Sequence, residues 1–239
     1  MRAEGWGLGA GGWRVSFGNW LLAMTLGIGI GSAHAADARF LALGDSYTIG
    51  EGVDADGRWP DQLAAALRKS GSAIAAPEIV ARTGWTTDEL SAAMDKHLFH
   101  PPYDLVTLLI GVNNQYRGRE LDNYRTEFRA LLQRAILLAD NRPQRVVVVS
   151  IPDWGVTRFG QHSGRDTRQI ARELDLYNAA NAEIAASLQV RYADVTAASR
   201  AGGDHADMLV GDGLHPSAAM YRRWVETIER QARAALSPP

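Results

Sequence analysis

Hydrophobic and polar residues follow two different periods along this chain. Short runs that are apolar at nearly every position, such as residues 146–149, are typical of strands covered on both faces of a sheet. Between these runs lie longer segments in which apolar residues recur every third or fourth position, as on one face of a helix. The last such segment, residues 217–236, carries an apolar stripe made of Met220, Trp224, Ile228 and Ala232.

The two periods predict strands and longer helices that alternate along the chain. The strands are expected near residues 39–43, 77–81, 104–110, 145–151 and 189–193. The helices are expected near residues 59–70, 86–96, 121–140, 168–188 and 217–236. Residues 152–168 show neither period and are expected to form a loop. Such alternation predicts an α/β fold with a parallel sheet and helices on both of its faces.

Composition and charge narrow the class of protein. The chain has 239 residues, of which 46% are hydrophobic, and this is enough for one core and one domain. It contains no cysteine, so it can form no disulfide and carry no cysteine-linked lipid. The formal net charge is −2 and no basic run with interleaved aromatic residues occurs, so the sequence offers no electrostatic footprint for nucleic acid.

The first 35 residues have the features of a secretory signal peptide. Arg2 and Arg14 precede an apolar stretch over residues 20–30, and Ala33-His34-Ala35 offers a small-x-small cleavage site. Cleavage after Ala35 would leave residues 36–239 as a single domain in the periplasm or outside the cell. The alternative is a retained anchor, although the apolar stretch is short and interrupted by glycine for a membrane span.

The segment Gly44-Asp45-Ser46 follows the first predicted strand. In open α/β sheets, ligands bind at the carboxyl ends of the strands, and Ser46 stands at such an end. A serine at that place can act as a nucleophile when a base lies within hydrogen-bond reach. The alternative is that Asp45 and Ser46 cap a helix or close a turn.

His215 is the candidate base, because Asp212 precedes it by three residues just before the last predicted helix. In such a turn the carboxylate can orient one imidazole nitrogen while the other nitrogen faces the serine. Asp153, after the fourth predicted strand, is a second candidate for this acid. The third predicted strand is followed by Gly111 and, after Val112, by two amide residues, Asn113 and Asn114. A nucleophile, a base with its acid and a neutral donor are the groups that acyl transfer requires.

In these sequence motifs, or blocks, the chain resembles the SGNH hydrolases, also called the GDSL esterase/lipase family. The resemblance runs from about residue 40 to the final helix, and its blocks stand in the order that the family has. The matching residues are Gly44-Asp45-Ser46, Gly84, Gly111-Val112-Asn113, and Asp212 with His215. Two positions depart from the family pattern, because Tyr47 replaces the commonest Leu and Asn114 stands where Asp is usual.

The resemblance implies a three-layer α/β/α sandwich around a five-stranded parallel sheet of flavodoxin-like order. It also implies that Ser46, His215 and Asp212 form a catalytic triad. The oxyanion would then be held by the backbone N–H groups of Ser46 and Gly84 and by the side-chain amide of Asn113. One such donor is typically worth about 3–4 kcal/mol in the rate. The alternative for Asn113 is an ordinary turn residue after a strand.

Other catalytic classes find less support in the sequence. Thr48 occupies the last glycine position of a Gly-x-Ser-x-Gly elbow, and no Gly-Lys-Ser/Thr follows a glycine loop. Asp204, His205 and Asp207 are close in sequence, but no second cluster of metal ligands is evident. We therefore expect neither a metal nor another cofactor.

Three aromatic residues, Trp85, Tyr116 and Trp154, follow the motif segments and are candidates for lining a substrate cleft. Such rings suit acyl chains or sugar faces, and the alternative is local packing. We expect an exported serine esterase that cleaves a small-molecule carboxylic ester of short-chain, aryl, lysophospholipid or thioester type through an acyl-enzyme. The alternatives are a carbohydrate O-acetylesterase and a non-catalytic carbohydrate-binding module of the cell envelope.

Overall fold

A computed structural model describes residues 8–9, 11–12 and 37–237 of the protein. The chain separates into residues 1–35 and residues 36–239, and the description below concerns the second part by itself. The predicted signal peptide lies outside the described residues. Among the helices that are described, none is both long enough and apolar enough to cross a membrane.

A parallel sheet forms the middle layer of this part. Its strands are β1 (Phe40–Asp45), β2 (Glu78–Arg82), β3 (Leu105–Leu109), β4 (Val146–Val149) and β5 (Arg191–Ala193). They lie in the order β2-β1-β3-β4-β5, and every neighbouring pair is parallel. The flavodoxin-like order is thereby confirmed.

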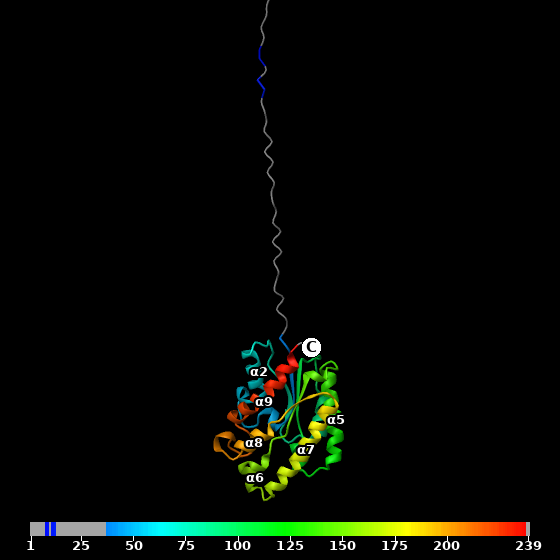
Figure 1. Ribbon diagram of the computed structural model, residues 1–239, viewed down its shortest axis with the longest axis vertical. Coiled ribbons are helices and arrows are strands. Elements are labelled where there is room, and N and C mark those ends of the chain that lie inside the picture. The colour runs from blue at the N-terminus through cyan, green and yellow to red at the C-terminus, as the bar shows by residue number, and fades with distance from the viewer. Residues whose placement is uncertain (1–7, 10, 13–36, 238–239) are drawn as a thin grey trace, which may run out of the picture. The chain divides into compact units, whose positions relative to one another are not determined.

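Helices cover both faces of the sheet, and the three-layer sandwich is confirmed. On one face α2 (Trp59–Lys69) packs against α9 (Ala218–Leu236), while α3 (Thr87–Lys96), α5 (Leu121–Leu138) and α7 (Thr167–Ser187) lie on the other (Figure 1). Shorter helices connect these layers: α1 (Ser46–Ile49), α4 (Val112–Tyr116), α6 (Arg158–His162), α8 (Thr196–Gly202), and the 3₁₀ turns η1 (Ala55–Gly57), η2 (Pro143–Arg145), η3 (Trp154–Val156) and η4 (Ala206–Met208).

The long helices begin and end close to the expected residues, because local signals mark their ends. At the start of α3, Thr86 and Glu89 form a capping box, in which each side chain satisfies the backbone of the other. At the start of α9, the hydroxyl of Ser217 accepts a hydrogen bond from the backbone N–H of Met220. The apolar stripe predicted for α9 is fully buried.

The predicted loop over residues 152–168 contains two short helices, η3 and α6. Asp153 caps η3 by accepting the N–H of Gly155 at 2.9 Å, and Thr157 caps α6 by accepting the N–H of Gly160 at 3.1 Å. Each helix is three to five residues long. A segment of that length is too short to show a helical period, so the pattern missed both helices.

Gly44 allows β1 and β3 to approach closely at their carboxyl ends. A Cβ atom on this residue would lie 2.5 Å from the carbonyl oxygen of Leu109 and would clash with the side chain of Thr48. Its φ is not positive, so space rather than an unusual backbone angle demands glycine. Ser46 therefore follows directly after a close approach between these two strands.

Candidate active site

Ser46 is the first residue of α1 and directly follows β1. Asp45 caps this helix, because its Oδ1 accepts a hydrogen bond from the N–H of Tyr47 at 3.0 Å. Ser46 is 5% exposed and lines a pocket of about 230 Å³. The helix-capping alternative thus applies to Asp45, while Ser46 faces the pocket.

His215 is held in this pocket by a single carboxylate, that of Asp212. The Oδ1 atom of Asp212 accepts the backbone N–H groups of Leu214 at 2.8 Å and of His215 at 3.0 Å. Its Oδ2 atom lies 2.6 Å from the Nδ1 of His215. Because an ionised carboxylate can only accept, Nδ1 carries the hydrogen and Nε2 is left as the basic nitrogen. The turn before α9 therefore fixes both the backbone and the tautomer of the histidine.

The environment of Asp212 favours its ionised form. Partial burial raises the pKa of this carboxyl group, but the hydrogen bonds from the ring of His215 and from two backbone N–H groups outweigh it. The net effect holds the pKa of Asp212 below its ordinary value. Its side chain is 43% exposed, so solvent screens the attraction between the carboxylate and the imidazole.

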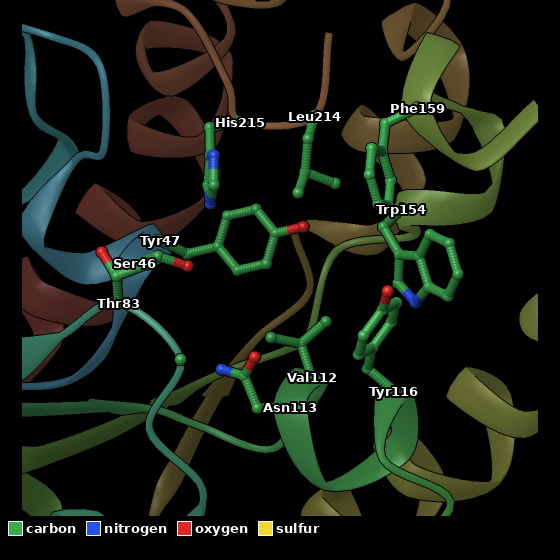
Figure 2. Close-up of a pocket in the computed structure, with 11 residues that line it drawn as sticks. Ser46, Tyr47, Thr83, Val112, Asn113, Tyr116, Trp154, Phe159, Leu214 and His215 are labelled. Atoms are coloured by element: carbon green, nitrogen blue, oxygen red, sulfur yellow. The ribbon is translucent and has the colours of Figure 1, made fainter. Parts of the chain in front are cut away.

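The candidate residues come together from separate segments of the chain. Ser46, His215 and Asn113 all line the same pocket, and Figure 2 shows the ring of His215 and the amide of Asn113 on opposite sides of it. Among the described residues, the hydroxyl of Ser46 makes no direct hydrogen bond to His215. The two side chains must approach each other for a proton to pass, as is common in active sites without substrate.

Asn113 and Gly84, the expected oxyanion-hole residues, line the same pocket as Ser46. One N–H of the Asn113 amide donates to the carbonyl oxygen of Trp85 at 2.9 Å, which fixes the amide plane. An amide group has two N–H donors, so the second remains for a developing oxyanion. Gly84 lines the same pocket with φ +86°, a left-handed conformation that favours glycine. Its carbonyl oxygen accepts the guanidinium of Arg117 at 2.7 Å, which holds this loop against α4.

Asn114, one of the two departures from the family pattern, has a structural role. It is fully buried, and its Oδ1 accepts the backbone N–H of Thr87 at 3.1 Å. Its Nδ2 donates to the hydroxyl of Thr87 at 2.6 Å, and that hydroxyl donates in turn to the carboxylate of Glu127. Asn114 thus ties the start of α3 to α4 and keeps the neighbouring Asn113 in place.

An aromatic wall made of Tyr116, Trp154 and Phe159 closes the pocket opposite Ser46 (Figure 2). The ring centroids of Tyr116 and Trp154 lie 5.4 Å apart, and those of Trp154 and Phe159 lie 6.1 Å apart. The guanidinium of Arg165 stacks on both Trp154 and Tyr116, at 5.2 and 5.7 Å from their centroids. The indole N–H of Trp154 donates to Gln115 at 2.8 Å. The wall is therefore braced from outside the pocket.

Two residues that the sequence offered as candidates for the site do not line the pocket. Trp85 is not part of the pocket lining, because its side chain is half-buried and packs against the core. Asp153, the second candidate for the acid, accepts the guanidinium of Arg200 at 2.9 Å instead of meeting the histidine.

The sequence reasoning missed several residues of the pocket lining. Val112 and Leu214 lie inside two of the motifs, so their positions could have indicated them. Phe159 lies in α6, a helix that the hydrophobic pattern did not predict. Within the described residues, no group of three or more His, Asp or Glu side chains could hold a metal ion.

The sequence model of the GDSL-like lipase/acylhydrolase family matches residues 42–223, which include each block of the pocket described above. The chain belongs to this family. It is therefore a carboxylic ester hydrolase of the GDSL type. No curated protein sequence matches the chain.

Solved structures of GDSL hydrolases share the fold at low sequence identity. The crystal structure of TesA is 20% identical, with a TM-score of 0.66 over 83% of this chain and 99% of the other. A lipase/acylhydrolase from Enterococcus faecalis is 21% identical, with a TM-score of 0.63 over 84% and 98%. Axe2, an acetylxylan esterase from Geobacillus stearothermophilus, is 18% identical, with a TM-score of 0.62 over 83% and 95%.

The hydrogen-bonded chain from Asn114 through Thr87 to Glu127 predicts the effect of restoring the usual family residue. In Asn114→Asp, the single hydroxyl proton of Thr87 would face two carboxylates, so we expect a loss of about 1–3 kcal/mol in the free energy of unfolding. Adding Glu127→Gln, which supplies a donor, should recover most of it. A double-mutant cycle in urea measures this coupling, and additive losses would contradict it.

Asp45 predicts a pH dependence of stability. Burial raises the pKa of Asp45 to about 7, although the N–H of Tyr47 opposes it, and the Oδ2 atom has no hydrogen-bond partner within the described part of the chain. The folded state holds this proton more tightly than the unfolded state does, so the protonated Asp45 adds to the free energy of unfolding. This contribution is present below about pH 4 and is lost as the pH rises through about 7.

Asp45→Asn keeps the capping oxygen but cannot titrate. We expect the stability of this variant relative to the wild type to rise between about pH 4 and 8, by an amount on the order of 4 kcal/mol at most. Urea unfolding at a series of pH values measures the difference. Parallel profiles for the two proteins would show that Asp45 titrates normally.

Proposed function

We propose that the protein hydrolyses small carboxylic esters through an acyl-enzyme, with Ser46 as nucleophile, His215 as general base and Asp212 as its orienting acid. The observation that supports this most is the meeting of Ser46, His215 and Asn113 around one pocket, with His215 held 2.6 Å from Asp212. These are a nucleophile, an oriented base and a neutral donor facing one space.

The reaction would run in two matched halves. The Oγ of Ser46 attacks the ester carbonyl carbon while its proton passes to the Nε2 of His215. The resulting oxyanion would accept the N–H groups of Ser46 and Gly84 and the free N–H of the Asn113 amide. The imidazolium then gives its proton to the leaving alcohol, and the C–O bond of the ester breaks. Water repeats the sequence on the acyl-enzyme and releases the acid.

The position of Asp212 explains why the histidine can accept a proton during attack. Its negative charge stabilises the imidazolium, and its contact with Nδ1 keeps the basic nitrogen turned to the pocket. Because Oδ1 of the same carboxylate also holds the backbone of the turn, the loss of Asp212 would both weaken and misplace the base.

The pocket supports esters of limited size. Its volume of about 230 Å³ lies below the range of about 300–1,000 Å³ typical of drug-sized ligand sites. The aromatic wall ends the pocket on the side opposite Ser46. The acetylxylan esterase and TesA share this fold, but their low identity leaves the choice of substrate in this protein open to experiment.

Ser46→Ala and His215→Ala test the proposed chemistry with p-nitrophenyl acetate. Each variant should lose kcat by about 10⁴-fold or more, and the double variant should lose hardly more than either alone, because the pair acts as a unit. Thermal unfolding of each variant is the control for folding. Multiplicative losses, or a Ser46→Ala variant that keeps its activity, would remove these residues from the mechanism.

We also propose that the enzyme is exported and that residues 1–35 are removed. The proposal rests on the basic start, the apolar stretch and the small residues at Ala33 and Ala35. After expression of the full chain, mass spectrometry should find a product that begins at residue 36. The variant Ala33→Asp should retain the leader, and a wild-type product of full length would contradict the proposal.

A further inference from the structure

The pocket contains a tyrosine hydroxyl group that makes no hydrogen bond to any described residue of the protein. The side chain of Tyr47 is 3% exposed and lines the pocket. Its ring packs 5.7 Å from the ring of His215 and 6.0 Å from that of Trp224. Among the described residues, no hydrogen bond involves its hydroxyl. Figure 2 shows the ring extending from the side of Ser46 across the pocket, with its oxygen towards Leu214 and the aromatic wall.

The hydroxyl of a largely buried tyrosine normally binds either a protein group or water, because a donor without any partner costs free energy. The neighbours that line the pocket near this oxygen are largely apolar, including Val112, Leu214 and Phe159. These three side chains offer no acceptor, and the carboxylate of Asp153, which also lies near Tyr47, accepts hydrogen bonds from Gly155 and Arg200 instead. Burial raises the pKa of Tyr47, so the hydroxyl keeps its proton and can both donate and accept. The leucine that is commonest at this position would have needed no partner.

We propose that the Tyr47 hydroxyl determines specificity by hydrogen-bonding an oxygen atom on the arm of the ester that lies along the aromatic wall. The favoured substrates would then be esters with a hydroxyl or ether oxygen in that arm, such as acylated sugars or polyols. This inference rests on the proposed function, since it assumes that the ester binds in this pocket.

The alternative occupant of the wall is a saturated hydrocarbon chain. Such a chain would displace the water that the free hydroxyl can bind and would leave the hydroxyl buried without a partner, which lowers affinity. An oxygen-bearing arm replaces that water with an equivalent hydrogen bond. The exposed ring of Tyr116, which is 49% accessible, also offers aromatic surface that suits the apolar face of a sugar. Both observations favour the same class of substrate.

Tyr47→Phe tests the inference because it removes the oxygen and keeps the ring. The substrates form two pairs of similar shape. In the acyl pair, p-nitrophenyl methoxyacetate is compared with p-nitrophenyl butyrate. In the alcohol pair, a methyl glucoside acetylated at O6 is compared with cyclohexylmethyl acetate. Dividing the kcat/KM of the variant by that of the wild type for each substrate removes differences in intrinsic reactivity.

We expect this ratio to fall by about fivefold to tenfold for the oxygen-bearing member of at least one pair, as the loss of one neutral hydrogen bond predicts. It should change by less than about twofold, or rise, for the hydrocarbon member. The pair that responds identifies the arm that Tyr47 contacts. Tyr47→Leu, the usual family residue, should shift the preference in the same direction and guards against an effect peculiar to phenylalanine.

Tyr221→Phe is the matched control. Tyr221 is fully buried and packs 5.1 Å from the same Trp224, and its hydroxyl has no partner among the residues that the structure describes, but it is not part of the pocket lining. The loss of the Tyr221 hydroxyl should leave the ratio of kcat/KM between the two members of each substrate pair unchanged. Equal changes for both members of both pairs in Tyr47→Phe would overturn the inference. The proposed function would still stand in that case if Ser46→Ala is inactive, so the two failures are distinguishable.

Discussion

The candidate active site depends on the register between β1 and β3. Gly44 pairs with Leu109, so Ser46 and Gly111 each lie two residues beyond the same rung of the sheet. The strands can keep this register only because Gly44 has no side chain, since a Cβ atom would lie 2.5 Å from the carbonyl oxygen of Leu109. A slip of one residue would reverse the side chains of a strand and separate the nucleophile from the amide of Asn113. The sheet therefore determines one half of the site.

The other half is fixed by a turn instead of a strand. The base enters from the segment before α9, where one carboxylate holds two backbone N–H groups and the imidazole. This turn is joined to α6 by a hydrogen bond from the N–H of Phe159 to the carbonyl oxygen of Gly213 at 2.9 Å. The segment that carries part of the aromatic wall thus also supports the base. The aromatic wall and the proposed base therefore share this support, although they come from distant parts of the sequence.

The sheet and the contact between Asp212 and His215 could be predicted from the sequence because both depend on local patterns. Val146 to Val149 can only be a strand covered on both faces, and Asp212 lies close enough to His215 to meet it within one turn. The pocket lining depends on directions that no local pattern contains. Trp85 packs against the core instead of the cleft, and Phe159 reaches the pocket from a helix of five residues. The partner of a buried side chain likewise follows only from coordinates.

The hydrogen-bonded chain at the start of α3 has a consequence for how such an enzyme can diverge. Thr87 has one proton to give, so an acid at position 114 and an acid at position 127 compete for it. A protein with the common aspartate at position 114 could acquire Asn114 and Glu127 without ever having two carboxylates facing Thr87 only if Asn114 arose first. The opposite order passes through an ancestor with two facing carboxylates. The residue that either site tolerates therefore depends on the residue at the other.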